Sequence, residues 1–212
     1  MNGLLQKVEQ HVKAQFIAQE GSHDWQHIDR VRRTALLLQQ HEGGDPLVIE
    51  LAALLHDISD HKYNGGDFEA GPKVVLDLLS QFTCPEELAN KVAAVVSVVS
   101  FKGALVTDSP TSLEGQIVRD ADRLDAIGAI GIARAFAYGG SRNRALYLPE
   151  ISPTLHSSKE AYAQDQGHTI NHFYEKLLLL KDRMETKSAQ KLAAERHEFM
   201  LLFLKQFKAE WA

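Results

Sequence analysis

Cysteine is almost absent from this 212-residue sequence, in which Cys84 is the single thiol. One thiol excludes an internal disulfide and also a thiolate-rich metal site. No stretch reaches the roughly 18 uninterrupted apolar residues of a membrane-spanning helix. The first ten residues lack the apolar core and small-residue cleavage site of a secretory signal. Together these absences predict a cytoplasmic protein that does not enter a membrane.

Clusters of positive charge are equally scarce. The formal net charge is −5, and the longest basic run is Arg30-Val-Arg-Arg33. A protein that binds duplex nucleic acid needs a basic surface that contacts the phosphates. We therefore expect no duplex nucleic acid partner and favour a small phosphorylated molecule as the substrate.

Apolar residues recur with helical spacing almost throughout the chain. The length is sufficient for one domain with a well-filled core. We predict an all-α, multi-helix bundle in a single domain that spans residues 1–212. Within it, a core at about residues 22–130 carries the candidate site, and C-terminal helices at 158–211 pack on that core.

Several residues mark where helices begin. Asp24 precedes one apolar-periodic segment, and Asp45-Pro46 is a cap followed by a first-turn proline. Thr83 and Thr111 each stand three residues before a glutamate, which is the spacing of a capping box. The expected helices cover residues 4–19, 25–40, 46–57, 69–79, 83–99 and 111–139, followed after an irregular stretch at 141–157 by two helices that break near Thr186.

The last helix contains the apolar run Phe199-Met-Leu-Leu-Phe-Leu204. This run is apolar on more than one face of a helix, so part of it must be buried elsewhere. Deep packing in the core is the favoured interpretation, and burial against a second subunit is the alternative. The protein is accordingly expected to be a monomer or a homodimer.

A possible metal site is formed by four residues on three predicted helices. His56 and Asp57 end an apolar helical run, His27 lies upstream, and Asp122 lies downstream in another apolar segment. Imidazole and carboxylate without thiolate suit Mn, Fe, Ni, Co, Zn or Mg. Acidic side chains are rarely buried unless they are paired or coordinated, so ion pairs with Arg119 or Arg123 are the alternative. Four protein ligands would leave positions open on a six-coordinate cation, as a hydrolytic site requires.

Four segments carry a family resemblance: residues 22–31, 54–62, 120–128 and 167–177. They resemble the HD-domain metal-dependent phosphohydrolase superfamily, and in particular a bacterial subgroup of short, single-domain members. The resemblance implies an HD-type helical bundle, with His27, His56, Asp57 and Asp122 binding a divalent metal ion, manganese being favoured. It also implies hydrolysis of a phosphate ester or anhydride, most simply by a nucleoside triphosphate pyrophosphohydrolase. A nucleotide monophosphatase or phosphodiesterase of the same superfamily is the alternative.

Two larger branches of that superfamily fit poorly. Guanosine tetraphosphate hydrolases carry Glu-Asp soon after their His-Asp, whereas Ile58-Ser-Asp-His61 follows here. Cyclic-dinucleotide phosphodiesterases carry a Gly-Tyr-Pro signature, which this sequence lacks.

Further residues are assigned by their place near the motifs. Asp60 stands where some related monophosphatases have a glutamate, and a carboxylate there could act as general base. Alternatively, it caps the loop or forms a salt bridge through His61 or Lys62. The expected substrate-binding residues are Lys62, which could neutralise a phosphate oxygen, and by resemblance His23, Tyr174 and Lys176, with Arg142 and Arg144 ranked last.

Two other classes of function remain open. An HD module could bind a nucleotide without cleaving it, although such a module would not need open metal positions. The carboxylates could instead form structural ion pairs in a helical interaction protein. The metal content of the purified protein separates this last class from the others.

Overall fold

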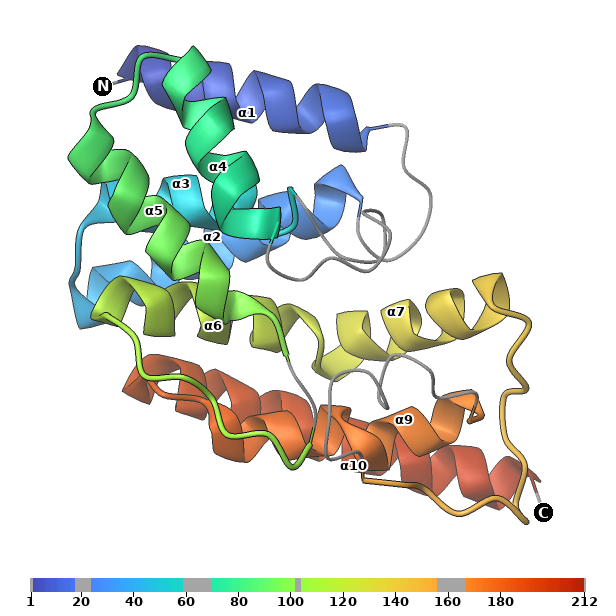
Figure 1. Ribbon diagram of the computed structural model, residues 1–212. Helices are drawn as coiled ribbons and strands as arrows, with labels where there is room; N and C mark the ends of the chain where they lie inside the picture. The colour runs from blue at the N-terminus through green and yellow to red at the C-terminus, as the bar shows by residue number, and fades with distance from the viewer. Residues whose placement is uncertain (1, 18–23, 59–69, 102–103, 156–166, 212) are drawn as a thin grey trace. The chain divides into compact units, whose positions relative to one another are not determined.

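The computed structural model describes residues 2–17, 24–58, 70–101, 104–155 and 167–211 (Figure 1). Every regular element in these ranges is a helix, so the predicted all-α class is confirmed. No helix among the described residues is long and apolar enough to cross a membrane. The chain divides into two compact units: Met1–Ser100 with Ser109–Asp122, and Phe101–Asp108 with Arg123–Ala212.

The first unit is built around one short apolar helix. It contains α1 (Asn2–Phe16), α2 (Trp25–Glu42), α3 (Pro46–Leu55), α4 (Ala70–Gln81), α5 (Glu86–Val99) and most of α6 (Leu113–Asp125). Helix α3 contacts α1, α2 and α5, while α4 lies along α5 (Figure 1). Residues Leu51 to Leu55 of α3 are fully buried because this part of the helix is apolar on all sides.

The two predicted aspartate caps are confirmed. Asp24 Oδ1 accepts a hydrogen bond of 2.9 Å from the backbone N–H of His27 at the start of α2. Asp45 Oδ1 accepts 2.9 Å from the N–H of Leu47 and 3.4 Å from that of Val48, with Pro46 in the first turn. Each carboxylate satisfies donors that have no partner inside the helix.

The two predicted capping boxes are wrong. Thr83 has a φ of 59° and belongs to the turn that ends α4, while α5 begins after Pro85 without a side-chain cap. Before α6, the cap is Ser112, whose Oγ accepts 3.3 Å from the N–H of Gly115. Helix α1 also ends earlier than predicted, at Phe16.

The second unit joins three helices through aromatic side chains. Its elements are α7 (Gly128–Ser141), α9 (Thr169–Glu175), the 3-10 helix η1 (Leu177–Arg183) and α10 (Lys187–Trp211). Phe136 of α7, Phe173 of α9 and Phe203 of α10 have ring centroids 5.8–6.2 Å apart. The predicted break near Thr186 separates η1 from α10.

The apolar run of α10 is only partly in the core. Met200 and Leu204 are buried, but Phe199 is 48% exposed, Leu201 41% and Leu202 62%. The prediction of deep packing is therefore wrong for these three residues, because the single stripe that α10 buries is narrower than its apolar run.

Candidate metal centre

His27 occupies the third position of α2 and is fully buried. The hydrogen bond from its own backbone N–H to Asp24 fixes the first turn that carries the imidazole. A ring that is shielded from water and held at a helix start has little freedom to turn away. The fold therefore presents the Nε2 atom of His27 at a defined place.

His56 is held by the backbone of the helix that it ends. Its Nδ1 lies 2.8 Å from the carbonyl oxygen of Ala53, one turn earlier in α3. Since a carbonyl only accepts, Nδ1 carries the proton and donates it. Nε2 of the neutral ring is then left with its lone pair, which is the arrangement seen in metal-binding histidines.

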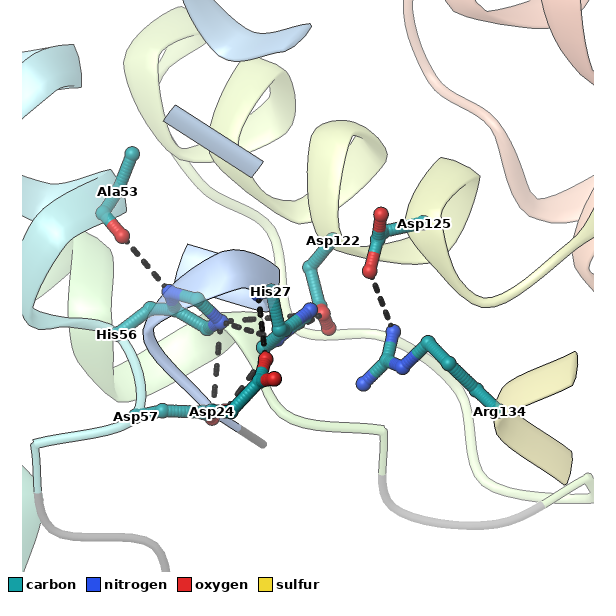
Figure 2. A network of polar contacts seen from close by, with 8 residues as sticks. All are labelled: Asp24, His27, Ala53, His56, Asp57, Asp122, Asp125 and Arg134. Carbon is teal, nitrogen blue, oxygen red and sulfur yellow. Dashed lines mark hydrogen bonds and ion pairs between the residues drawn. The ribbon is translucent and has the colours of Figure 1, made fainter. Parts of the chain in front are cut away.

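Four side chains converge on one point of the first unit (Figure 2). The two Nε2 atoms of His27 and His56 are 3.2 Å apart. Nε2 of His27 is 3.4 Å from Asp57 Oδ2 and 3.6 Å from Asp122 Oδ1. Nε2 of His56 is 3.6 Å from Asp57 Oδ1 and 3.8 Å from Asp122 Oδ1. The histidines are deeply buried, while the side chains of Asp57 and Asp122 are 12% and 27% exposed.

These separations suit atoms that share a cation. Direct hydrogen bonds between an imidazolium and a carboxylate are about 2.7–2.9 Å long, so the nitrogen–oxygen distances are too long for such bonds. Ligands about 2.0–2.1 Å from a metal lie about 3 Å apart in an octahedron and roughly 3.4 Å in a tetrahedron. The donor set of two nitrogens and two carboxylates thus fits a divalent cation in both chemistry and spacing.

Asp57 and Asp122 join this cluster differently. One ligand atom each from His27, His56 and Asp57 lies within 4.8 Å of the others, so these three form a mutually close group. Asp122 stands outside that group, but its Oδ1 faces both histidine nitrogens. The side chain of Asp122 is also the most exposed of the four, at 27% against 12% for Asp57.

Arg119 and Arg123, the predicted alternative ion-pair partners of the carboxylates, form hydrogen bonds elsewhere. Arg119 donates to the carbonyl oxygens of Val98 and Ser109, each at 2.9 Å. Arg123 donates to Asp108 Oδ1 at 2.6 Å and to the carbonyl of Arg183 at 2.7 Å. Through these bonds the side chain of Arg119 reaches the last residues of α5, and the side chain of Arg123 contacts two other residues of the second unit. Among the described residues, Asp122 forms its ion-pair contacts with His27 and His56.

The other predicted site residues lie either outside the described residues or in the second unit. His23, Asp60 and Lys62 lie outside the described residues. Tyr174 and Lys176 belong to the second unit, where Lys208 Nζ lies 4.9 Å from the Tyr174 ring and Lys176 Nζ 4.9 Å from the Phe101 ring. Arg142 and Arg144, also in the second unit, both face the ring of Tyr138.

Two supporting interactions were not predicted from the sequence. The carbonyl of Ala53 sets the proton position on His56, and a backbone atom leaves no signal in residue type. In the second unit, Asp125 is buried and pairs with Arg134 at 2.7 Å (Figure 2). Asp122 and Asp125 are three residues apart, a spacing that places side chains on the same side of a helix, so the sequence held no signal that they contact different partners.

Sequence and structure comparisons agree on one family. The HD domain family model matches residues 24–127. YpgQ of Bacillus subtilis (strain 168) is 40% identical over 194 residues, covering 91% of this chain and 86% of YpgQ. A solved protein from Lactobacillus plantarum has a TM-score of 0.88 at 36% identity, covering 100% of this chain and 98% of its own.

Two further solved structures bear on chemistry. A HD-superfamily hydrolase from Bacillus thuringiensis has a TM-score of 0.74 at 40% identity, with 98% of this chain and 96% of that chain covered. YpgQ in complex with ADP has a TM-score of 0.76 at 34% identity, with 97% of each chain covered.

An all-α fold with a His, His-Asp and Asp cluster defines the class of protein. The chain belongs to the HD domain family. Its likeness to an HD-superfamily hydrolase supports a hydrolase.

Proposed function

We propose that this protein is a divalent-metal-dependent phosphohydrolase that acts on nucleotides, most simply as a nucleoside triphosphate pyrophosphohydrolase. The observation that carries the proposal is the spacing of 3.2–3.8 Å from the two Nε2 atoms to each other and to the carboxylates. His27, His56, Asp57 and Asp122 would hold the cation. Manganese is favoured, with magnesium, nickel, cobalt, iron or zinc compatible with the same donors.

The four proposed ligands differ in burial, and we assign their roles accordingly. The two imidazoles lie deepest, and the proton of His56 is kept on Nδ1 by the carbonyl of Ala53, so its Nε2 can donate a lone pair. The carboxylates of Asp57 and Asp122 are closer to solvent, where a phosphate would approach. A bound divalent cation supplies Lewis acidity and activation of water for attack on phosphorus.

Proton transfer and charge neutralisation are assigned to residues between α3 and α4. We expect Asp60 to accept or relay the proton of the attacking water, and Lys62 to offset the negative charge that develops on the phosphoryl group. His23 would donate a hydrogen bond to the substrate. Tyr174 and Lys176 are proposed to contact it as well, by resemblance to the family.

A nucleotide as substrate is supported by the relatives. YpgQ was solved in complex with ADP, and this chain covers nearly all of that protein. The chain's net charge of −5 and short basic runs also favour a small phosphorylated molecule over a polymer.

The deciding experiment is a turnover assay with metal-stripped protein, reconstituted with Mn or Mg. It uses a panel of nucleoside mono-, di- and triphosphates and separates phosphate from pyrophosphate. We expect pyrophosphate release from triphosphates, lost in His56→Ala. The matched control is His41→Ala, because His41 is an exposed histidine on the last turn of α2.

The products decide among the alternatives. Release of phosphate from monophosphates would identify a nucleotide monophosphatase. Binding of metal and nucleotide without turnover would identify a binding module. Failure to bind any divalent cation would reject the metal site itself and leave the carboxylates as structural groups.

A further inference from the structure

The last turn of α6 contains the proposed metal ligand Asp122, and the helix ends three residues later at Asp125. The final carbonyl groups of an α-helix have no partner inside the helix, so a helix end frays unless other groups hold it. The proposed site needs the Asp122 carboxylate at a fixed place, since its Oδ1 lies 3.6 Å and 3.8 Å from the two histidine Nε2 atoms. The contacts that hold the end of α6 therefore bear on the metal site.

An arginine of α10 binds the backbone at this helix end. Nη1 of Arg196 donates a hydrogen bond to the carbonyl oxygen of Leu124. A basic side chain at a helix C-terminus also neutralises the negative end of the helix dipole. Burial lowers the pKa of Arg196 below its ordinary value, and the negative charge of Asp125 opposes that shift. The helix end and the carboxylate thus both favour the charged guanidinium.

The turn that follows α6 leaves room for this arginine. Gly128 has a φ of 76°, in the left-handed region that favours glycine. A Cβ atom at this position would lie 3.0 Å from Cγ and 3.1 Å from Cβ of Arg196. The stem of the arginine therefore packs directly against the glycine, and a larger residue there would displace it.

A second arginine, from α7, binds the side chain of the last residue of α6. Nη1 of Arg134 donates a hydrogen bond of 2.7 Å to Asp125 Oδ2. The two side chains are 16% and 6% exposed, so solvent screens their attraction only weakly. A carboxylate at a helix C-terminus is disfavoured by the dipole, and the like charge of Asp122 lies one turn away on the same side. The bond to Arg134 offsets both effects.

We propose that Asp125, Arg134 and Arg196 are positioning residues, which hold the last turn of α6 so that the Asp122 carboxylate faces the cation. This assignment rests on the proposed metal-dependent function. Both arginines bind residues of their own unit, Leu124 and Asp125, and the continuous helix α6 transmits the constraint to Asp122.

The test is the Mn affinity of the full-length protein, measured by isothermal titration calorimetry well below the melting temperature of every variant. Arg134→Met and Arg196→Met keep an apolar stem and lose the guanidinium. Each should weaken Mn binding about tenfold, the low end for groups that support metal ligands. Arg134→Lys keeps a cation opposite Asp125 and should recover most of the affinity.

Leu204→Ala is the matched control for loss of stability. Leu204 is buried on α10, about 12 Å along the helix axis from Arg196, so its truncation leaves a cavity in the same unit far from the end of α6. This variant should have a lower melting temperature and the Mn affinity of wild type. Circular dichroism verifies that each variant stays helical, and two independent arginine variants keep the test decisive if one of them fails to fold.

A double-variant cycle tests whether the effect passes through Asp122. In Asp122→Ala the cation would be held by the other three residues and bound more weakly. Arg134→Met should then add no further loss, because the ligand that it positions is gone. A further tenfold loss in that background, an equal loss in Leu204→Ala, or unchanged affinity in both arginine variants would overturn the positioning role and leave the proposed metal site intact. A wild type that binds no Mn would reject the metal site and the positioning role together.

Discussion

At the scale of single residues, the position of His27 depends on Asp24. The cap bond of 2.9 Å links the Asp24 carboxylate to the backbone N–H of the same residue whose imidazole enters the cluster. Without that bond, the first turn of α2 has an unsatisfied donor and can fray. Asp24 is therefore a positioning residue, which acts on the site through the backbone of His27.

Replacement of Asp24 separates capping from charge. Asp24→Ala should lower the free energy of unfolding by about 1 kcal/mol, the typical value of an N-cap. It should also weaken binding of Mn about tenfold, as loss of a supporting interaction does in metal sites. Isothermal titration calorimetry measures the affinity and urea unfolding the stability.

Asp24→Asn is the control, because asparagine caps as well as aspartate. Its free energy of unfolding should equal that of wild type, and its affinity for Mn should stay within about twofold. Equal affinity in the Ala and Asn variants would show that the cap does not position His27.

The sequence predicted the four residues that the structure brings together, because their types are those of metal ligands and their motifs resemble the HD pattern. His56, Asp57 and Asp122 also end or interrupt apolar helices, whereas His27 lies in the first turn of its helix. The sequence does not show which of the four side chains are buried and which are partly exposed. The burial of His27 and the partial exposure of Asp122 result from how α2, α3 and α6 pack, and that packing is absent from the residue types. The tautomer of His56 depends on a carbonyl, which every residue has.

At the scale of elements, α3 and α6 are joined by a contact at their beginnings. Oε1 of Glu114 accepts a hydrogen bond of 3.1 Å from the N–H of Asp45, the residue that caps α3. This backbone hydrogen bond is the main cause that lowers the pKa of Glu114 below its ordinary value. The glutamate thus connects two helices that contribute to the cluster.

The lowered pKa predicts how acid affects this contact. Because the pKa of Glu114 is lower in the folded than in the unfolded state, its ionised form stabilises the fold above the unfolded value of about 4.3. That contribution is lost as the pH falls through the folded pKa. In Glu114→Gln, the deficit in unfolding free energy relative to wild type should be largest near neutral pH and should shrink below about pH 4. Urea unfolding of both proteins at several pH values measures it, and a deficit that is independent of pH would contradict the assignment.

The helix starts were predicted correctly where a single aspartate caps the helix. They were predicted incorrectly where a threonine matched the capping-box spacing but another residue or another role took its place. Asp24 and Asp45 are followed directly by their helices. Thr83 matched a capping box, but the chain needed a left-handed residue to end α4 at the same place. At α6, Ser112 is the cap, and Glu114 is engaged with Asp45 and not with Thr111. The valine-rich segment 92–99 was correctly predicted as helix, since length outweighs the strand preference of its side chains.

At the scale of the whole molecule, all four residues of the cluster belong to the first compact unit. A cation that binds the folded cluster and not the unfolded chain stabilises the protein by mass action. At 100 times its dissociation constant, the gain is about 2.7 kcal/mol. For a chain of this length, that gain corresponds to a rise in melting temperature of roughly 5–11 °C.

Thermal unfolding with added Mn and with a chelator should show this difference. His56→Ala should melt at the same temperature in both, while His41→Ala should respond as wild type does. A metal-induced rise that persists in His56→Ala would place the cation elsewhere on the protein.

The boundary between the two units falls inside α6, after Asp122. The cluster therefore depends on a helix that is also part of the second unit, and the first hundred residues do not contain all of its members. During synthesis on the ribosome, His27, His56 and Asp57 emerge early. At the usual 5–20 residues per second, Asp122 follows Asp57 only about 3–13 s later. The nascent protein thus passes through an interval in which three of the four groups are present and a cation could be held only incompletely.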